Sequence, residues 1–396
     1  MLNPRLAHLP EYPFPRLRAL LDPLPAPDGL TPVVMSIGEP QHAYPSLVNE
    51  SLAANGHLFN KYPPNNGTPE FRRAVADWLT RRYGLPEGLI TAERHVLPVS
   101  GTREALFQAA LVFVPRVKAG RQPAVLMPNP FYQCYAGAAV AAGAEPIYLP
   151  THREHNFLPD LAAIPEELLA RTAMFYLCSP ANPQGTVAGH DYLVHLIGLA
   201  REWDFVVAMD ECYAEIYTES PPTGALEVCA ATGGVLDNVL VFHSLSKRSN
   251  VAGLRSGFLA GDPSLVESFL SIRDYGGSPM PLPVQATSVA LWGEESHVAA
   301  NRALYREKFD LAERVLGNRF GFYRPAGGFF LWLDVGDGEA AARKLWTEAA
   351  VRVLPGTYLT APESDGPDPG HEYIRLALVP DLEITGEALR RIAETL

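Results

Sequence analysis

A lysine and a carboxylate each follow an apolar run that is typical of a buried strand. Lys247 comes shortly after the run 239–242, and Asp210 directly follows the run 205–209. Burial disfavours the charged form of a lysine and makes its amine a better nucleophile, although most lysines are simply solvated. A carboxylate at the end of a buried strand needs a partner, and either a protonated ring nitrogen or a helix N-terminus is suitable. Lys247 is therefore a candidate nucleophile, and Asp210 is a candidate partner for a protonated ring nitrogen.

Three further strand ends carry groups that could hold a phosphorylated ring. Ser100-Gly101-Thr102 lies between a predicted strand and a helix, where free N–H groups, hydroxyls and the helix dipole attract phosphate. Tyr132 could present a flat face to a ring, and the Asn182 amide could donate to an oxygen. A helix cap, packing at the rim of a core and turn geometry explain the same residues without a ligand.

The functional prediction rests on all these strand ends together. In open α/β sheets, ligands bind where strands end and loops begin. The five strand ends offer a phosphate cradle, a stacking aromatic, an amide, an acid and a lysine. Pyridoxal 5′-phosphate (PLP) requires this set, because it is an electron sink that a lysine holds and whose ring nitrogen pairs with an acid.

The segments that must position these residues alternate between short apolar runs and amphipathic stretches, as βαβ units do. Most of the apolar runs lack polar alternation, as expected for strands that are covered on both faces. Helices are predicted at 103–114 and 192–202, among others. We therefore expect an α/β fold with a mostly parallel, seven-stranded sheet. The predicted strands span residues 95–99, 124–127, 146–149, 173–177, 205–209, 239–242 and 257–260.

The 396-residue chain is longer than a single hydrophobic core usually supports, which predicts two domains. A large domain is expected over residues 46–283. Residues 1–45 and 284–396 are expected to form a smaller α+β domain, with the Gly- and Pro-rich segment 276–283 at the boundary. The elements predicted for the smaller domain are helices at 16–21, 284–316 and 339–349 and strands at 328–334, 351–354 and 373–377.

Composition and charge exclude several classes of protein. The chain has 32 Lys and Arg against 44 Asp and Glu, a net charge of −12, and the acids are spread along it. Nucleic acids and anionic membranes require clustered cations, so neither is expected as a partner. The four cysteines have no metal or redox spacing, so we expect reduced thiols and no metal site. No signal-peptide pattern and no apolar run of about 20 residues is present, which favours a cytoplasmic protein.

The order of the motifs resembles that of the class I and II aminotransferases of PLP fold type I over nearly the whole chain. Each motif is weak alone, but the ordered set at these spacings is specific. The matching patterns are Tyr62-x4-Gly67-x3-Phe71-Arg72, Ser100-Gly101-Thr102, Pro130-x-Tyr132-x-x-Tyr135, Asn182-Pro183-x-Gly185, Asp210-x-x-Tyr213, Ser244-x-Ser246-Lys247, Gly253-x-Arg255-x-Gly257 and Tyr373-Ile374-Arg375-Leu376. The resemblance implies a large PLP-binding domain, a small domain, and amino-acid and keto-acid substrates.

The resemblance also implies a role for each matching residue. Lys247 would bind the cofactor covalently and move the proton, and Asp210 would keep the ring nitrogen protonated. Arg375 would form a bidentate contact with the substrate α-carboxylate, which Gly38 and Asn182 would also approach. The other expected cofactor contacts are Tyr132 on the ring face, Tyr213 and Asn182 at the ring hydroxyl, Gly101, Thr102, Ser244 and Arg255 at the phosphate, and Ser100, Ser246 and the Tyr62 of a second subunit. Sites shared in this way imply a homodimer.

The sequence around Lys247 and the N-terminal Pro-Glu-Tyr-Pro-Phe look most like bacterial succinyldiaminopimelate aminotransferases. This resemblance implies amino transfer between glutamate or 2-oxoglutarate and N-succinyl-L,L-diaminopimelate, in lysine biosynthesis. Arg103, Arg248 or Asn250 could contact the distal carboxylate or succinyl amide of that substrate, although exposure to solvent also explains their polarity.

Other functions remain open at this point. An aminotransferase for another amino acid, or a PLP-dependent β-lyase, would share every cofactor residue. A non-enzymatic regulator with a related domain would need an appended basic DNA-binding domain, and the core already uses the chain. The complete pair of Lys247 and Asp210 also argues against such a protein.

Overall fold

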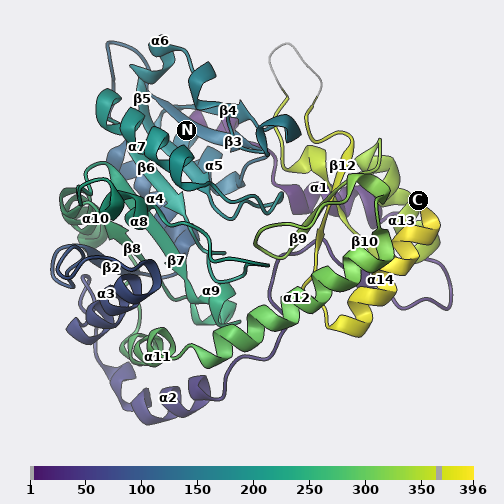
Figure 1. The fold of residues 1–396 in the computed structure, drawn as a ribbon, viewed down its shortest axis with the longest axis horizontal. Helices are drawn as coiled ribbons and strands as arrows, with labels where there is room; N and C mark the ends of the chain where they lie inside the picture. The colour runs from purple at the N-terminus through teal and green to yellow at the C-terminus, as the bar shows by residue number, and fades with distance from the viewer. Residues whose placement is uncertain (1–3, 363–367) are drawn as a thin grey trace.

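A mostly parallel sheet of seven strands is the centre of the computed structural model, which describes residues 4–362 and 368–396 (Figure 1). The strand order is β2-β8-β7-β6-β5-β3-β4, and β8 runs antiparallel to both of its neighbours. The predicted α/β class and all seven predicted strands are confirmed. The strands are β2 (Val96–Val99), β3 (Ala124–Asn129), β4 (Glu145–Pro150), β5 (Thr172–Cys178), β6 (Val206–Asp210), β7 (Val239–Ser244) and β8 (Gly257–Gly261).

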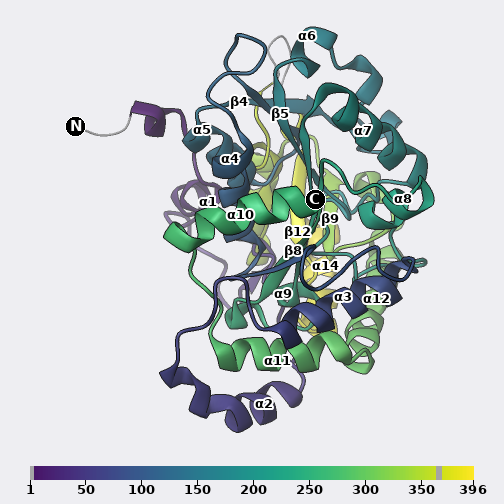
Figure 2. The same ribbon diagram turned by 90° about the vertical axis from the view of Figure 1, so that its left-hand side faces the viewer.

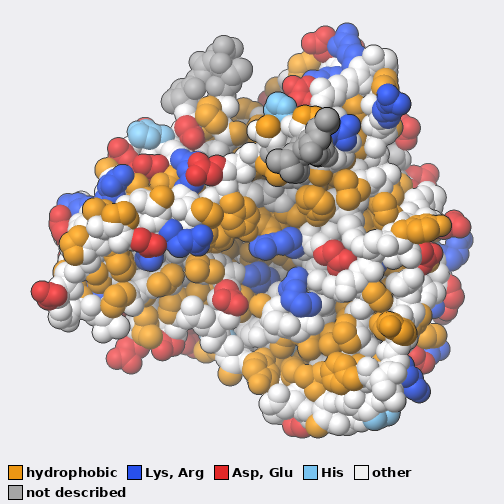
Figure 3. Space-filling view, turned by 180° about the vertical axis from the view of Figure 1, so that it is seen from behind, with side chains coloured by type: hydrophobic (Ala, Val, Ile, Leu, Met, Phe, Trp, Pro, Cys, Tyr) orange, Lys and Arg blue, Asp and Glu red, His pale blue; other side chains and the backbone are white. Residues whose placement is uncertain are grey.

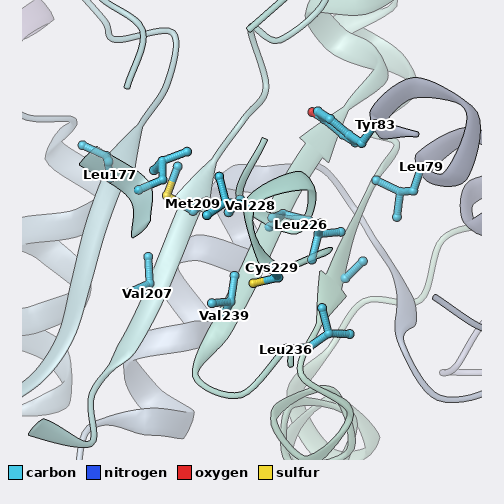
Figure 4. Packing of buried hydrophobic residues seen from close by; sticks show 14 of the residues in the cluster. Leu79, Tyr83, Leu177, Val207, Met209, Leu226, Val228, Cys229, Leu236 and Val239 are labelled. Atoms are coloured by element: carbon cyan, nitrogen blue, oxygen red, sulfur yellow. The ribbon is translucent and has the colours of Figure 1, made fainter. Parts of the chain in front are cut away.

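The central strands are apolar because both faces of the sheet are covered. Every residue of β6 and β7 is buried. Successive side chains alternate between two cores, so Val207 packs on one face and Ala208 on the other. Figure 4 shows the first core, where Val207 of β6 and Val239 of β7 lie beside Val228 and Cys229 of the helix α8 (Ala225–Ala231).

Helices cover the two faces in separate groups (Figure 2). The helices α4, α5 and α10 pack in the core that includes Ala208. The helices α3, α7, α8 and α11 pack in the core that includes Val207. The predicted helices at 103–114 and 192–202 correspond to α4 and α7. In the described residues, no helix has the length and apolar character needed to cross a membrane. The bounds of these helices, with those of two short ones, are α3 (Pro69–Tyr83), α4 (Thr102–Phe113), α5 (Gln133–Ala142), α6 (Glu166–Leu169), α7 (His190–Trp203), α9 (Leu245–Arg248), α10 (Pro263–Gly276) and α11 (Leu282–Gly293).

A smaller α+β part joins the two ends of the chain. Leu17 and Leu21 near the N-terminus share a core with Leu376 and Leu389 near the C-terminus. One sheet has the antiparallel order β11-β12-β9, and β1 pairs with β10 in parallel. The elements are α1 (Pro13–Leu21), β1 (Val33–Val34), α12 (Ser296–Leu316), β9 (Phe330–Asp334), α13 (Gly338–Ala349), β10 (Val351–Arg352), β11 (Leu354–Pro355), β12 (Tyr373–Ala377) and α14 (Leu382–Thr395).

Two of the predicted elements are wrong, because the structure has two separate elements where the sequence predicts one. The helix expected over 284–316 is α11 followed by α12, because the Glu294 carboxylate accepts from the backbone N–H groups of Ser296 (2.6 Å) and His297 (3.1 Å) and so caps a new helix. The strand expected over 351–354 is β10 and β11, which pair with different partners, β1 and β12.

The helix α11 packs with the large sheet. It contacts α3 and α2 (Leu47–Asn55), and its Leu291 and Trp292 belong to the core that includes Val207. The Gly- and Pro-rich segment expected at the boundary lies between α10 and α11. The division of the chain at residues 283 and 284 stays a prediction.

Candidate active site

A cavity of about 610 Å³ lies at the carboxyl ends of the central strands and also reaches β12 and the N-terminal segment. Most of the predicted site residues line it, although they are far apart in the sequence. Tyr62, Ser100 and Gly101 are the exceptions. The predicted residues that line the cavity are Gly38, Thr102, Tyr132, Asn182, Asp210, Tyr213, Ser244, Ser246, Lys247, Arg255 and Arg375.

Asp210 is the last residue of β6 and is buried, with an exposed fraction of 4%. The Tyr135 hydroxyl donates to its Oδ2 at 2.7 Å, and the Cys212 N–H donates to its Oδ1 at 3.3 Å. Burial raises the pKa of the Asp210 carboxyl above its ordinary value, and the two hydrogen bonds reduce that shift. A cation at the cavity side of this carboxylate would be strongly stabilised.

Lys247 lies on α9, directly after β7. The Ser244 hydroxyl accepts from the Ser246 N–H at 3.1 Å and so caps this short helix. Burial lowers the pKa of the Lys247 amine to about 8. The amine donates to the backbone carbonyl of Gly38 and lies 5.9 Å from the centre of the Tyr213 ring. A substantial neutral fraction near pH 8 makes this amine a nucleophile and a base.

An anion cradle forms where α4 begins. Gly101 has a φ of +88°, and a Cβ at this position would lie only 1.9 Å from Arg255 Nη2, so only glycine lets the guanidinium approach the helix start. Arg255 Nη2 donates to the Ser100 carbonyl at 3.2 Å. The Ser100 hydroxyl instead donates to the Ser278 carbonyl at 2.7 Å, away from the cavity lining. Thr102 and Ser244 line the cavity here and complete a donor set for a phosphate.

Arg375 on β12 is held for contact with an anion. Its Nη1 donates to Asn182 Oδ1 at 3.1 Å and its Nη2 to the Ser36 carbonyl at 2.7 Å. Its guanidinium lies 4.5 Å from the centre of the Phe330 ring, and its buried Nε has no partner among the described residues. Burial lowers the pKa of Arg375 to about 10. A carboxylate would offset this unfavourable burial.

Gly38 also has a steric reason to be glycine. A Cβ at Gly38 would lie 2.6 Å from the ring of Phe330, which the N-terminal segment crosses closely. Ile37, Gly38 and Glu39 line the cavity. The Gly38 backbone is therefore near both Lys247 and the Arg375 region.

Tyr132 and Arg103 form a pair at the cavity. Arg103 Nε donates to the Tyr132 hydroxyl, and the guanidinium lies 5.7 Å from the centre of the ring. Both residues line the cavity. Among the residues that the structure describes, the two terminal amino groups of Arg103 have no hydrogen-bond acceptor. They can bind an anionic group of a ligand.

The other two cationic or amide candidates for the substrate side chain lie elsewhere. Arg248 is 2% exposed, donates to the Leu291 carbonyl at 2.7 Å and pairs with Glu295 at 2.6 Å. The Asn250 amide donates to Asn301 Oδ1 at 3.1 Å. Neither residue lines the cavity. Of the three candidates, only Arg103 can meet a ligand there.

Two residues of the site have no predicted role from sequence. Tyr135 donates to Asp210, and Phe330 packs under Arg375. Tyr135 follows Tyr132 by three residues, which places both on one side of the first turn of α5 and offers a signal that could have been read. Phe330 carries no such signal, because an apolar residue at the start of a strand is ordinary core.

Together these residues fit PLP. Among the described residues, the structure provides a buried carboxylate that forms no ion pair, an amine with a lowered pKa, a cradle that a Cβ would fill, and a separate buried guanidinium whose Nε has no hydrogen-bond partner. The residues that would hold the cofactor are Lys247, Asp210, Tyr213, Tyr132, Asn182 and the cradle residues. Arg375 and Arg103 remain for the groups of a substrate.

Comparisons with known proteins agree with this geometry. The family model for aminotransferase class I and II matches residues 31–392. An LL-diaminopimelate aminotransferase of Desulforudis audaxviator is 32% identical, over 98% of this chain and 96% of its own length. A crystal structure of an aminotransferase from Neisseria meningitidis has a TM-score of 0.94 and 42% identity and covers 99% of both chains. A probable N-succinyldiaminopimelate aminotransferase from Thermus thermophilus has a TM-score of 0.82 and 25% identity, over 93% of this chain and 96% of that one.

Proposed function

Because the chain belongs to the class I and II aminotransferases, which use PLP, we propose that it moves an amino group between glutamate or 2-oxoglutarate and N-succinyl-L,L-diaminopimelate. The observation that carries the choice of substrate is the position of Arg103. This cation lines the cavity, and the contacts that we propose for the cofactor and the α-carboxylate do not include it. The reaction would belong to lysine biosynthesis.

In this proposal the large sheet provides the cofactor contacts. Bound PLP supplies an electron sink that weakens the bonds at the substrate α-carbon. Lys247 would hold the cofactor through its amine. Once the amine of the substrate had displaced it from the cofactor, the freed Lys247 amine, with a pKa of about 8, would take and return the α-proton. Asp210 stabilises the protonated ring nitrogen, and Tyr135 orients the Asp210 carboxylate through its hydrogen bond of 2.7 Å.

The positions of the side chains support the remaining cofactor contacts that we propose. The phosphate binds at Thr102, Ser244 and Arg255, with Gly101 leaving room for the guanidinium. Ser100 contributes through its backbone, because its hydroxyl is used by Ser278. The other proposed contacts are Tyr132 on the face of the ring, Tyr213 and Asn182 at the ring hydroxyl, and Ser246 beside the phosphate.

The smaller part of the molecule provides the α-carboxylate contact. Arg375 forms the bidentate contact, and Asn182 and the Ser36 carbonyl hold its guanidinium plane in place. The backbone of Gly38 lines the cavity two residues after Ser36, the residue whose carbonyl accepts from Arg375. Every amino acid and keto acid of the reaction carries this carboxylate, so these residues serve both half-reactions.

Arg103 then accounts for the far end of the substrate. N-succinyl-L,L-diaminopimelate carries two carboxylates besides the one at the reacting carbon, and glutamate carries one. The two unpaired terminal amino groups of Arg103 can form a forked contact with one of them. Tyr132 fixes Arg103 through Nε, so the fork is oriented before the substrate binds.

Unacylated L,L-diaminopimelate is a second candidate substrate. The relative from Desulforudis audaxviator is named for it and matches almost the whole chain. This compound also has a distal carboxylate, but its distal amine is a cation, which the guanidinium of Arg103 would repel. We therefore favour the succinylated compound.

A half-reaction screen tests the proposal. The PLP form of the protein is mixed with N-succinyl-L,L-diaminopimelate, L,L-diaminopimelate or L-glutamate, and the conversion to the amine form is followed by absorbance. Fastest conversion per unit concentration with the succinylated donor supports the proposal, and preference for the unacylated donor contradicts it. Pyruvate and ammonia formed from a cysteine-like substrate without a keto acid would indicate a β-lyase.

We also propose a cytoplasmic homodimer with shared sites. Tyr62 is fully exposed, and Phe59, Tyr44 and Ile37 are also exposed apolar side chains of the N-terminal region. Figure 3 shows a face on which hydrophobic side chains gather in several areas. A second copy would cover such a surface, and Tyr62 would then reach the phosphate of its partner's site.

A further inference from the structure

A buried lysine lies outside the cavity and forms no ion pair with any carboxylate of the described residues. Lys308 of α12 is 1% exposed. Its amine donates to the backbone carbonyls of Leu378 (3.0 Å) and Val379 (3.3 Å) and lies 2.6 Å from His42 Nε2. Among the described residues, no carboxylate lies within ion-pair distance of it. Burial of a charge is unfavourable unless hydrogen bonds or an opposite charge compensate for its lost hydration.

The charge of Lys308 fixes the direction of a hydrogen-bond chain that begins at its amine. A charged amine has three N–H donors and no acceptor, so two N–H groups reach the carbonyls and the third donates to His42 Nε2. The proton of the neutral imidazole is then on Nδ1, which donates to Asn301 Oδ1 at 2.8 Å. The Asn301 amide donates in turn to the backbone carbonyl of Lys247 at 3.3 Å. The chain thus joins a buried cation to the backbone of the proposed catalytic lysine.

One face of α12 carries this chain. Asn301, Tyr305 and Lys308 are spaced by four and three residues, which places them on one side of the helix. All three are buried, and the His42 ring packs on the Tyr305 ring with a centroid distance of 4.5 Å. His42 is therefore held by three side chains of one rigid helix.

His42 lies at the end of the segment that crosses the cavity. We call residues 36–43 the strap. The Ser36 carbonyl accepts from Arg375 at 2.7 Å, and the Gly38 carbonyl accepts from Lys247. The strap has few other anchors beyond Gly38, one of which is the Ala43 carbonyl, which accepts from Asn250 at 3.4 Å. His42 is the best-anchored side chain of its second half.

Near neutral pH, the charge states of Lys308 and His42 agree with hydrogen bonds that are donated from Lys308 to His42 and from His42 to Asn301. Burial lowers the pKa of His42 below its ordinary value, and the nearby Lys308 lowers it further, while the Asn301 hydrogen bond opposes both. Burial also lowers the pKa of Lys308 to about 8, and the carboxylate of Asp381 opposes this. At pH 7 the imidazole is therefore neutral and the amine still mostly charged, which is the arrangement that the chain requires.

We propose that Lys308 is a positioning residue that acts through His42 to hold the strap over the cavity. The strap in turn fixes Arg375 and presents the Gly38 backbone to the substrate α-carboxylate. Lys308 therefore contributes to the binding of every amino-acid and keto-acid substrate without touching any of them.

Two variants remove the chain, and a third serves as a matched control. Lys308→Met removes the donor at nearly constant length, and His42→Ala removes its acceptor. Lys118 also donates to three backbone carbonyls, those of Thr172, Trp203 and Asp204, but does not line the cavity. Lys118→Met thus removes a similar set of hydrogen bonds from a place where no strap depends on them.

Hydrogen exchange and steady-state kinetics of the PLP-bound proteins give the readouts. We expect faster amide exchange in residues 36–43 for Lys308→Met and His42→Ala, and wild-type exchange there for Lys118→Met. The KM for L-glutamate should rise about tenfold in the first two variants, with kcat changed less than about twofold, which is the loss of one charge-assisted hydrogen bond. The double variant should resemble the single ones, because both break one chain.

Unchanged exchange of residues 36–43 and an unchanged KM in His42→Ala would overturn the proposal. A lower active fraction at wild-type KM in Lys308→Met would show that the lysine only stabilises the fold, and would also overturn it. If Lys308→Met does not fold, His42→Ala decides the question alone. The kinetic readout rests on the proposed use of glutamate. A wild-type enzyme that does not turn over glutamate would refute that donor, and the exchange data would still decide the role of Lys308.

Discussion

Two adjacent carboxylates, Asp210 and Glu211, are both almost completely buried, yet their surroundings shift their pKa values in opposite directions. Glu211 accepts from the Tyr83 hydroxyl at 2.8 Å and from the Ala225 N–H at 2.9 Å, and it lies 3.0 Å from His243 Nε2. These contacts outweigh burial and lower the pKa of Glu211. Asp210 accepts from Tyr135 and Cys212 and forms no ion pair with the described residues, so burial prevails and raises the pKa of its carboxyl.

The difference between these neighbours separates a structural group from a functional one. Glu211 faces the core on one side of the sheet, where every partner that it needs is already part of the fold. Asp210 faces the cavity on the other side and has no cation among the described residues within ion-pair distance. A protonated ring nitrogen would supply that cation. An incompletely compensated charge in a cavity is thus a stronger functional signal than burial alone.

The largest expected effect is a loss of kcat when the functional carboxylate, Asp210, is removed. Asp210→Ala should lower kcat by about 10²–10³-fold, because the electrostatic stabilisation of the ring nitrogen is lost. Some PLP should stay bound, held by Lys247 and the phosphate cradle. Single-turnover kinetics with L-glutamate measure the effect, and Glu211→Gln, with kcat within about threefold of wild type, is the matched control. A near-normal kcat in Asp210→Ala would refute the proposed role of Asp210.

Replacement of the structural carboxylate, Glu211, should instead lower the stability of the fold. Glu211→Gln should lower the free energy of unfolding at pH 7 by about 3 kcal/mol, because an amide has one acceptor oxygen where the carboxylate has two, which leaves the buried donor of Tyr83 or Ala225 without an acceptor. Since the pKa of Glu211 is lowered in the fold, its contribution is complete above about pH 4.5 and is lost as the pH falls through the lowered value. Urea unfolding of the apoprotein between pH 3 and pH 7 measures this.

In the same unfolding experiment, Asp210→Asn should change the stability in the opposite direction to Glu211→Gln. The raised pKa of Asp210 means that its ionisation destabilises the apoprotein as the pH rises. The Asn variant of the apoprotein should therefore be as stable as wild type at pH 7 or more so. Equal losses of stability in Asp210→Asn and Glu211→Gln would show that the two carboxylates do not differ as described.

A smaller effect is expected at the substrate side. Arg375→Gln should raise the KM for L-glutamate about 100-fold, since a forked, charge-assisted contact is worth about 2–3 kcal/mol. Arg375→Lys should recover only part of this loss, because a lysine keeps the charge but not the fork. Steady-state kinetics in both directions test it, and a change confined to one direction would argue against a contact with the α-carboxylate.

The smallest expected effect tests the distal contact. Arg103→Gln should raise the KM for N-succinyl-L,L-diaminopimelate about tenfold and leave single-turnover reaction with L-norleucine, which has no distal carboxylate, unchanged. Arg81→Gln removes the same charge from the exposed side of α3, outside the cavity lining, and is the control. Equal effects on both substrates would assign Arg103 to Tyr132 and the cofactor rather than to the substrate.

The sheet and most of the residues that line the cavity could be predicted from sequence because their signals are local. Strands covered on both faces are uniformly apolar, and Asp210 and Lys247 interrupt that pattern where a strand ends. The phosphate cradle was visible through Gly101, whose small size is required by Arg255.

The features that sequence reasoning missed depend on contacts between distant segments. Glu294 caps α12 with its side chain, and nothing in the helical periodicity marks that break. Tyr135 reaches Asp210 across 75 positions, and His42 reaches Lys308 across 266. Arg103, Arg248 and Asn250 were equal candidates in the sequence, because only the fold decides which of them lines the cavity.

The central claim is that Lys247 is the residue that binds PLP, and chemical trapping tests it most directly. The PLP-loaded protein is reduced with borohydride, which makes the bond between the lysine and the cofactor permanent, and its peptides are analysed by mass spectrometry. We predict the added phosphopyridoxyl mass on the peptide that contains Lys247, and loss of the label in Lys247→Ala. Label on another lysine, such as Lys308 or Lys118, or a label that persists in Lys247→Ala, would contradict the account.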